Sequence, residues 1–386
     1  MAIPFSYNLR NLRLRLGATL MTATGIALTV AIAIFIMALL AGLKSAFVTS
    51  GDPLNVLVMR KGSQAELSSS VDRPALQAMK YLPGIAHDAH GDPEVSPEMV
   101  VVIVLPRQDG TGEVNVTVRG MTPMGIEMQP AIRLAAGRWF NPGQREIVVS
   151  NSIHQRFGHA NLGDSVSFGK GDWTVVGVFD AGHTSSDSEI WTDVNQMATD
   201  FDRPVFSSVL LHADNPVAAD ALAHRVSDDQ RLELDGMLES AYYAEQTKSG
   251  APIQFVGTVV AFIMAIGSCF AAMNTMYAAV AYRGREIATL RILGFSRPSI
   301  LTSFVLESIA LSLMGGLVGI LLMLPFNGMT TGTSNAVTFS EVVFRLQLTP
   351  ALLAKAIAFS AIMGLIGGLA PAWQASRRDI VASLRG

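Results

Sequence analysis

Charged side chains gather in one short stretch between two long apolar runs, residues 281–300, with the sequence AYRGREIATLRILGFSRPSI. Residues 249–282 contain no Asp, Glu, Lys or Arg, and residues 298–340 contain only Glu307. Between these two apolar runs lie five charged residues: Arg283, Arg285, Glu286, Arg291 and Arg297. Such a pattern offers a binding surface rather than catalytic groups, so we treat this stretch as the first candidate site.

Placed on a helix, Ile287, Leu290 and Leu293 recur every three residues and are predicted to share one apolar stripe. Gly294 is predicted to end the helix. The charged residues of the helix lie off this stripe: Arg285, Glu286 and Arg291. Two interpretations remain open. The helix either anchors the chain at the cytoplasmic membrane surface, or it inserts its apolar residues into a groove of a cytoplasmic partner while its charges fix the register.

Other groupings of reactive side chains are weaker. The sequence HDAHGD at 87–92 has two histidines and two aspartates, and His183 precedes Asp187 and Glu189. Neither has a second cluster of ligands, so we interpret both as solvated loops. Sets of Ser, His and Asp can be assembled from residues 44–250, but none has the context of a nucleophile elbow. We expect no catalytic residue and no metal site, and therefore no enzyme activity in this chain.

Composition places part of the chain in a membrane. Of its 386 residues 50% are hydrophobic and 15% charged, with a mean hydropathy of +0.38, whereas a soluble domain carries about 25% charge. The deficit is uneven, because residues 44–248 hold 16 Lys and Arg against 27 Asp and Glu, a net charge of −11. This acidic region resembles an ordinary soluble domain and argues against a nucleic-acid partner.

Four apolar runs are long enough to span a bilayer, which takes about 20 residues. They are residues 16–43, 253–281, 300–324 and 353–373. The first is too long for the core of a cleaved signal peptide, so we expect a retained anchor. The predicted fold is an integral membrane α-helical protein with four transmembrane helices. A large mixed α/β domain, residues 44–250, is inserted between helices 1 and 2.

The orientation follows from the cations near the ends of these runs. One side collects ten arginines: Arg10, Arg13, Arg15, Arg283, Arg285, Arg291, Arg297, Arg377, Arg378 and Arg385. The opposite side has only Arg345 and Lys355. We therefore expect a multi-pass protein of the inner membrane with three cytoplasmic segments: 1–15, 282–298 and 374–386. The domain at 44–250 and a short loop at 325–352 are expected on the extracytoplasmic side.

Within the inserted domain, alternation predicts strands and capping residues predict helices. In GEVNVTVRG (112–120) valines alternate with Asn115, Thr117 and Arg119, as in a half-buried strand. The other predicted elements are a strand at 101–106, a strand leading into a helix at 146–158 with Ser150 or Asn151 as cap, a hairpin at 164–179 around Gly169, and a helix at 215–229 with Asn215 as cap.

Residues 282–319, YRGREIATLRILGFSRPSILTSFVLESIALSLMGGLVG, resemble the signature of the FtsX/MacB-type permease family of ABC transporters. In that family a segment R-x-x-E-I-x-x-L-R-x-x-G precedes a helix with Glu and a glycine pair. The closing PAWQASRRDIVASLRG, the N-terminal anchor and residues 143–180 are similar to other parts of the same family. The resemblance covers nearly the whole chain in the expected order.

The resemblance implies that the chain is the membrane half of a machine driven by ATP. No G-x-x-x-x-G-K-[ST] motif occurs in the sequence, so we expect Mg-ATP to be held by a dimer of a separate ATPase subunit. By resemblance the coupling residues are Arg285, Glu286, Ile287, Leu290, Arg291, Leu293 and Gly294. The implied mechanism is mechanotransmission, in which ATP-driven motion of these residues moves the outer domain. Membrane lipids, a second permease protomer (identical or a paralogue) and a periplasmic adaptor are the other expected partners.

Two further features concern the spanning helices. Six glycines are placed for close helix contact, either within the chain or in the seam of a dimer: Gly315, Gly316, Gly319, Gly364, Gly367 and Gly368. Glu307 matches the glutamate of the family and is expected near the cytoplasmic end of its helix. Its alternative interpretation is a structural carboxylate paired with Arg285 or Arg291.

Three functions are compatible with this sequence. The first is a permease for export or efflux that works with an ATPase. The second is a signalling device whose motion controls an extracytoplasmic hydrolase without transport. The third is extraction of lipid or lipoprotein from the outer leaflet.

Overall fold

The computed structural model describes residues 16–48, 50–108, 110, 112–182, 184–247, 251–335 and 338–377. The chain divides into two compact units, each built from segments that are distant in sequence. The described parts of residues 1–41, 252–329 and 346–386 form the helical unit. The described parts of residues 42–251 and 330–345 form the α/β unit.

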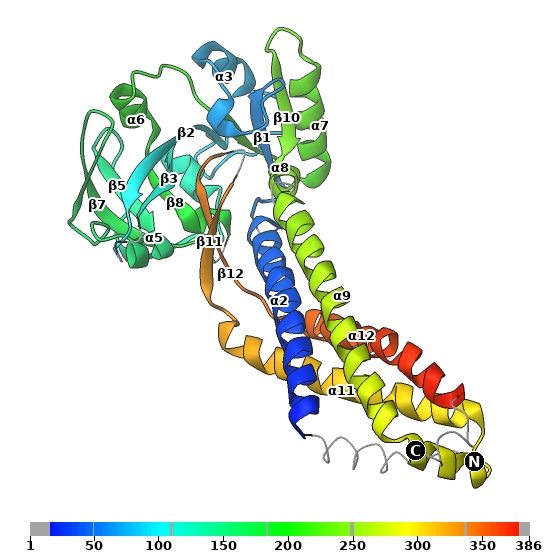
Figure 1. The fold of residues 1–386 in the computed structure, drawn as a ribbon. Coiled ribbons are helices and arrows are strands. Elements are labelled where there is room, and N and C mark those ends of the chain that lie inside the picture. The colour runs from blue at the N-terminus through cyan, green and yellow to red at the C-terminus, as the bar shows by residue number, and fades with distance from the viewer. Residues whose placement is uncertain are drawn as a thin grey trace. The chain divides into compact units, whose positions relative to one another are not determined.

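Four long helices dominate the helical unit (Figure 1). They are α2 (Leu16–Val48), α9 (Ala251–Tyr282), α11 (Arg297–Met323) and α12 (Pro350–Arg377). Each is long and apolar enough to cross a membrane. The four predicted long apolar helices are confirmed for the described residues, and each is observed at the predicted place in the sequence.

The start of α11 shows how local sequence fixes a helix end. The Ser296 hydroxyl accepts a hydrogen bond from the backbone N–H of Ser299 at 3.4 Å, and Pro298 occupies the first turn, where a backbone donor is not needed. The helix therefore begins at Arg297, three residues before the predicted run. Beyond its end, the single 3-10 turn η4 (Leu324–Phe326) follows.

A short helix, α10 (Gly284–Ile292), connects α9 and α11. Gly294 adopts a φ of +91°, in the left-handed region that favours glycine. The prediction that Gly294 ends this helix is confirmed. The helix is shorter than the predicted coupling segment 282–298, because Tyr282 still belongs to α9 and Arg297 already belongs to α11.

The α/β unit contains a ten-stranded sheet with the order β10-β1-β9-β2-β3-β8-β5-β7-β4, and β6 pairs with β7. Its strands are β1 (Asn55–Arg60), β2 (Val95–Pro106), β3 (Glu113–Met121), β4 (Arg133–Gly137), β5 (Glu146–Ser150), β6 (Ser165–Phe168), β7 (Gly171–Asp180), β8 (Glu189–Asp193), β9 (Ser208–His212) and β10 (Leu234–Leu238). The pairs β3–β8 and β5–β7 are parallel, and all other pairs are antiparallel.

Short helices follow these strands. They are η1 (Glu66–Ser68), α3 (Arg73–Met79), α4 (Pro123–Glu127), α5 (Asn151–Arg156), η2 (Ser185–Ser188), α6 (Val194–Asp200), α7 (Pro216–Asp228) and α8 (Glu239–Gln246). The last of them, α8, leads from β10 to α9. The predicted caps are observed: the Asn215 side chain accepts from the N–H of Ala218 at 2.9 Å, and Ser150 caps α5. The predicted hairpin is present as β6 and β7, with Gly169 at a φ of +62°.

The predicted loop at 325–352 contains a hairpin that the sequence analysis did not anticipate. Strands β11 (Thr330–Ser334) and β12 (Glu341–Arg345) pair antiparallel and belong to the α/β unit. Glu341 Oε1 lies 2.7 Å from Nη2 of both Arg107 and Arg156. These partners are about 200 residues away in sequence, so local periodicity could not reveal the contact.

Candidate functional site

Helix α10 is buried at its beginning and exposed at its end. Ile287 and Ala288 are 3% and 2% exposed, whereas Ile292 and Leu293 are 61% and 65% exposed. Leu290 is half-buried between these two regions. A partner protein can therefore reach the second half of α10, while the apolar residues of the first half are already covered by the chain itself.

The prediction that Ile287, Leu290 and Leu293 share one stripe is wrong. A step of three residues in an α-helix falls about 60° short of a full turn, so Ile287 and Leu293 point about 120° apart. One is buried and the other is exposed. Arg285 and Glu286 lie on the exposed side of the first turn, as expected from the sequence.

Arg283, the residue that precedes α10, forms a buried ion pair with Glu307 of α11. Nη1 of Arg283 lies 2.7 Å from Oε2, and Nη2 lies 2.8 Å from Oε1 of Glu307. The two side chains are 7% and 4% exposed. The predicted partners of Glu307 were wrong, because Arg285 points outward and Arg291 donates to the backbone carbonyl of Phe295 at 3.2 Å. The sequence analysis had counted Arg283 only among the charged residues of this stretch and the arginines that set the orientation, and had given it no partner.

Apolar contacts surround this ion pair. Ile287 belongs to a buried cluster whose other members come from three spanning helices: Met276 and Val280 of α9, Ile300, Phe304 and Val305 of α11, and Ala372 and Ala375 of α12. The guanidinium carbon of Arg283 lies 5.8 Å from the centre of the Phe304 ring. The first turn of α10 is thus packed in one apolar cluster with residues of α9, α11 and α12, and the ion pair before it adds a charged contact with α11.

Two of the predicted glycines bring α11 against α2. A Cβ atom added at Gly315 would lie 2.8 Å from the carbonyl oxygen of Ala23. At Gly319 it would lie 2.6 Å from the carbonyl oxygen of Ala27. These distances leave no space for a side chain, so glycine is what permits the two helices to approach so closely.

The other four glycines lie against helices of the same chain as well. A Cβ at Gly364 of α12 would lie 2.6 Å from Ser312 Oγ of α11, and one at Gly367 would lie 3.0 Å from Ala272 Cβ of α9. Gly316 and Gly368 contact further serines in the same way: Ser360 and Ser308. Contacts within the chain therefore explain all six glycines, and a place in a dimer seam stays a prediction.

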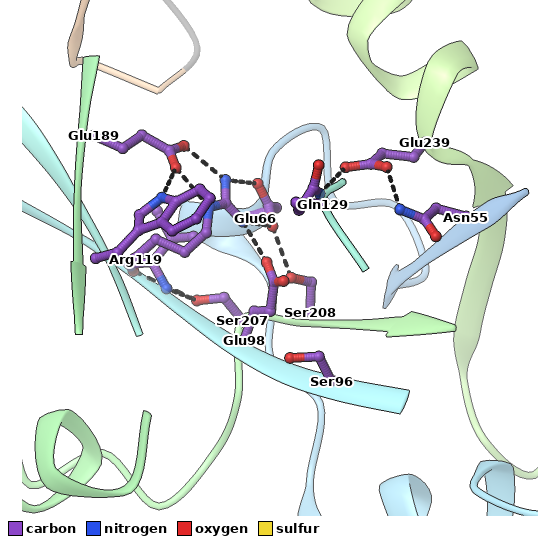
Figure 2. A network of polar contacts seen from close by, with 12 residues as sticks. Asn55, Glu66, Ser96, Glu98, Arg119, Gln129, Glu189, Ser207, Ser208 and Glu239 are labelled. Carbon is purple, nitrogen blue, oxygen red and sulfur yellow. Dashed lines mark hydrogen bonds and ion pairs between the residues drawn. The ribbon is translucent and has the colours of Figure 1, made fainter. Parts of the chain in front are cut away.

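A second polar site lies within the α/β unit (Figure 2). Arg119 of β3 donates hydrogen bonds to three buried carboxylates, at 2.7 Å to Glu66 Oε1, 2.5 Å to Glu98 Oε2 and 2.9 Å to Glu189 Oε1. The Ser208 hydroxyl also donates to Glu66, at 2.7 Å. These side chains come from η1, β2, β3, β8 and β9, so the network ties distant parts of the sheet together.

The alternation of valines with polar residues in β3 gave a wrong prediction of exposure for the second half of the strand. It predicted that Asn115, Thr117 and Arg119 would face solvent, but only Asn115 is exposed, while Thr117 and Arg119 are both 8% exposed. β3 lies in the interior of the sheet, and both of its faces are covered from Val116 onward. The polar side of the strand therefore holds the charge network rather than water.

The carboxyls of this network have opposite pKa shifts. Burial and the neighbouring Glu66 charge raise the pKa of Glu98 to about 8, although Arg119 opposes the shift. Burial also acts to raise the pKa of Glu66, but attraction to Arg119 and hydrogen bonds from Arg119 and Ser208 leave it below its usual value. Glu98 therefore holds a proton near neutral pH while Glu66 is ionised.

The loop at 87–92 is an ordered turn in which Asp88 Oδ1 accepts from the N–H groups of His90 and Asp92, each at 2.8 Å. Among the described residues, no three His, Cys, Asp or Glu side chains gather as metal ligands. His183 lies outside the described residues. So do the arginines of the segments 1–15 and 378–386.

Two family profiles match this chain. One, described as a MacB-like periplasmic core domain, matches residues 19–229, which is more than half of the sequence. The other, described as an FtsX-like permease C-terminal domain, matches residues 258–380 and includes α10, Arg283 and Glu307. Together the two profiles cover all but the ends of the sequence and the short stretch between them.

Curated relatives agree with these matches. The macrolide export ATP-binding/permease protein MacB of Pasteurella multocida is 23% identical, over 95% of this chain and 57% of that protein. The uncharacterized ABC transporter permease YknZ of Bacillus subtilis is 26% identical, over 71% of this chain and 70% of that protein. The chain spans little more than half the length of the first of these relatives.

Two solved structures resemble part of the chain. The extracellular domain of YknZ is 17% identical with a TM-score of 0.36, over 47% of this chain and 99% of that chain. The periplasmic region of MacB from Actinobacillus actinomycetemcomitans is 13% identical with a TM-score of 0.37, over 49% of this chain and 90% of that chain.

Proposed function

Because this chain belongs to the MacB/FtsX-type family of ABC transporter permeases, we propose that it couples a partner ATPase to movement of its α/β unit during export. The observation that carries this proposal is the division of α10. Its first turn is attached to three spanning helices, while Ile292 and Leu293 are exposed at its end. A helix that is fixed at one end and accessible at the other can transmit a displacement from a partner to the membrane helices.

The partner we propose is a dimeric ATPase subunit that binds Mg-ATP. The exposed apolar residues of α10 enter a groove on the ATPase, and the charged residues Arg285, Glu286 and Arg291 set the register. ATP binding closes the ATPase dimer and displaces α10. Since α10 contacts α9, α11 and α12 through one buried cluster, the helices respond together.

This mechanism requires a defined orientation in the inner membrane. The cytoplasmic side holds α10 and both ends of the chain, and the α/β unit works on the extracytoplasmic side. The arginine-rich sequence around α10 supports this orientation, because cytoplasmic loops carry an excess of Lys and Arg. A second permease protomer supplies the other half of the machine.

Among the compatible functions, export is favoured by the relatives. The Pasteurella multocida protein is named for macrolide export, whereas the Bacillus subtilis permease is uncharacterized. In this proposal the α/β unit moves against an extracytoplasmic adaptor, and the work is delivered outside the membrane. Signalling and lipoprotein extraction would use the same coupling through α10.

Purification of the full chain with its ATPase subunit tests the proposal. I292E/L293E places two charges at the exposed end of α10, so we expect the affinity for the ATPase to fall by about tenfold or more. V217E is the control, because Val217 of α7 is 79% exposed in the other unit and receives the same kind of change. Equal affinities of I292E/L293E and V217E would contradict the docking role of α10.

A further inference from the structure

We propose that the Arg283–Glu307 ion pair is a mechanical joint that makes α10 and α11 move as one body. The inference rests on the proposed function in one respect, namely that a force acts on α10. It assigns to these two residues a positioning role that is separate from binding the ATPase.

The geometry of the pair suits this role. Each terminal nitrogen of the Arg283 guanidinium donates to its own oxygen of Glu307: Nη1 to Oε2 at 2.7 Å and Nη2 to Oε1 at 2.8 Å. Two parallel bonds between planar groups fix orientation as well as distance, which a single hydrogen bond or an apolar contact does not do. The pair is also shielded from water, since its side chains are 7% and 4% exposed, so solvent competes little for these bonds.

The position of the pair in the chain is equally specific. The covalent link between α10 and α11 lies at the end of α10, through residues 293–296, and it includes the left-handed Gly294. The ion pair joins the two helices at the other end of α10. From Arg297 to Glu307 α11 rises about 15 Å, which is close to the length of about 13 Å that the nine residues of α10 span. The two helices are therefore connected at both ends of α10.

The backbone of residues 293–296 alone would transmit little of a displacement of α10 to α11. Gly294 and Ser296 are exposed, and glycine allows backbone rotation at the corner. The apolar contacts of Ile287 hold the helices together but let them slide, because dispersion contacts have little directional preference. The ion pair, with its two directional bonds, resists both rotation and sliding of α10 against α11.

The test measures the distance between α10 and α11 in the full chain, reconstituted in lipid nanodiscs without ATPase. The single cysteine is removed by C269A, and spin labels are attached at I292C and M314C, both at exposed positions. Electron–electron resonance then reports the distribution of distances between the labels. In the otherwise unchanged protein we expect one narrow distance.

The decisive variant is R283M/E307L, which replaces both charges by apolar groups of similar size. Such replacements commonly leave a protein folded, so packing is retained while the directional bonds are lost. We expect its distance distribution to broaden and the single narrow peak to be lost. T22V/T275V is the matched control, because it removes a 2.7 Å contact between α2 and α9, away from α10, and should leave the peak narrow.

A peak in R283M/E307L as narrow as in the control would overturn the proposal. If this double variant does not yield folded protein, E307Q is measured instead, because it keeps the size of the side chain and one acceptor oxygen. A broadened distance distribution in E307Q supports the proposal, and a peak as narrow as in the control overturns it. The measurement contains no ATPase, so it is independent of the docking experiment. Failure of the ATPase to bind contradicts the proposed function, whereas a narrow peak in the variant contradicts only the joint.

Discussion

Ser360 of α12 lies directly against Gly316 of α11, and its hydroxyl donates a hydrogen bond to the backbone carbonyl of Ser312, 2.5 Å away. A Cβ atom added at Gly316 would lie 2.5 Å from Oγ and 2.7 Å from Cβ of Ser360. Helices α11 and α12 therefore pack closely at this point, because Gly316 has no side chain and Ser360 contacts its backbone. This contact within the chain accounts for the glycine at position 316.

G316A is expected to lower the stability of the protein by about 1–3 kcal/mol, because the added methyl forces apart two packed helices. G267A in α9 is the control, since no atom lies within 4 Å of a Cβ at that position. Alanine favours the helix there, so its stability should be unchanged or slightly higher. Thermal unfolding of the purified protein measures both, and equal midpoints would show that the α11–α12 contact is looser than described.

Removal of Arg119 should destabilise the α/β unit strongly. R119M leaves Glu66, Glu98 and Glu189 buried together without a cation, a change that typically costs about 3–5 kcal/mol. R231A breaks an exposed pair with Asp229 and should leave the unfolding midpoint unchanged, because solvent screens such pairs. Similar midpoints for the two variants would mean that the buried network does not hold the sheet together.

The raised pKa of Glu98 makes stability depend on pH. In the folded state Glu98 binds its proton more tightly than in the unfolded state, where the pKa of the carboxyl is near 4.5. The contribution of this proton to the free energy of unfolding is therefore complete below pH 4.5 and is lost as the pH rises toward 8. We expect the unfolding midpoint, followed by tryptophan fluorescence, to fall between about pH 5 and 8. E98Q should reduce this slope without abolishing it, because burial also raises the pKa of Glu239. An unchanged slope in E98Q would contradict the assignment.

A single carboxylate oxygen links the β11–β12 hairpin to two arginines of the α/β unit. Arg107 and Arg156 both contact Glu341 Oε1 at 2.7 Å, so E341Q weakens two charged contacts at once. We expect faster amide hydrogen exchange in residues 330–345 and no change in β5. S167A, which removes an exposed hydrogen bond from Ser167 of β6 to Asp172 of β7, is the control. The same protection of the hairpin in E341Q as in S167A would show that the pair is dispensable.

The number and order of the spanning helices were predictable, because about 20 consecutive apolar residues have few other interpretations. Local signals also identified Asn215, Ser150, Gly169 and Gly294, since caps and left-handed turns depend on neighbouring residues. For the same reason the predicted start of α10 lay within a few residues of the observed start at Gly284.

The contacts of the charged residues were not predictable in the same way. Glu307 pairs with Arg283 rather than with Arg285 or Arg291. Which arginine reaches Glu307 depends on the direction in which the chain turns between α9 and α10. Arg119 is buried because the sheet extends on both sides of β3, and alternation within one strand carries no information on its neighbours. Both errors concern tertiary contacts between segments that are distant in sequence.

The account depends on α10 and the α/β unit lying on opposite sides of one membrane. Single cysteines at L293C and V217C in a C269A background, both exposed, allow this to be measured with a thiol reagent that does not cross lipid. In cells with a permeabilised outer envelope V217C should react and L293C should not, and in inverted inner-membrane vesicles the reactivity should reverse. Reaction of both cysteines from the same side would contradict the proposed coupling.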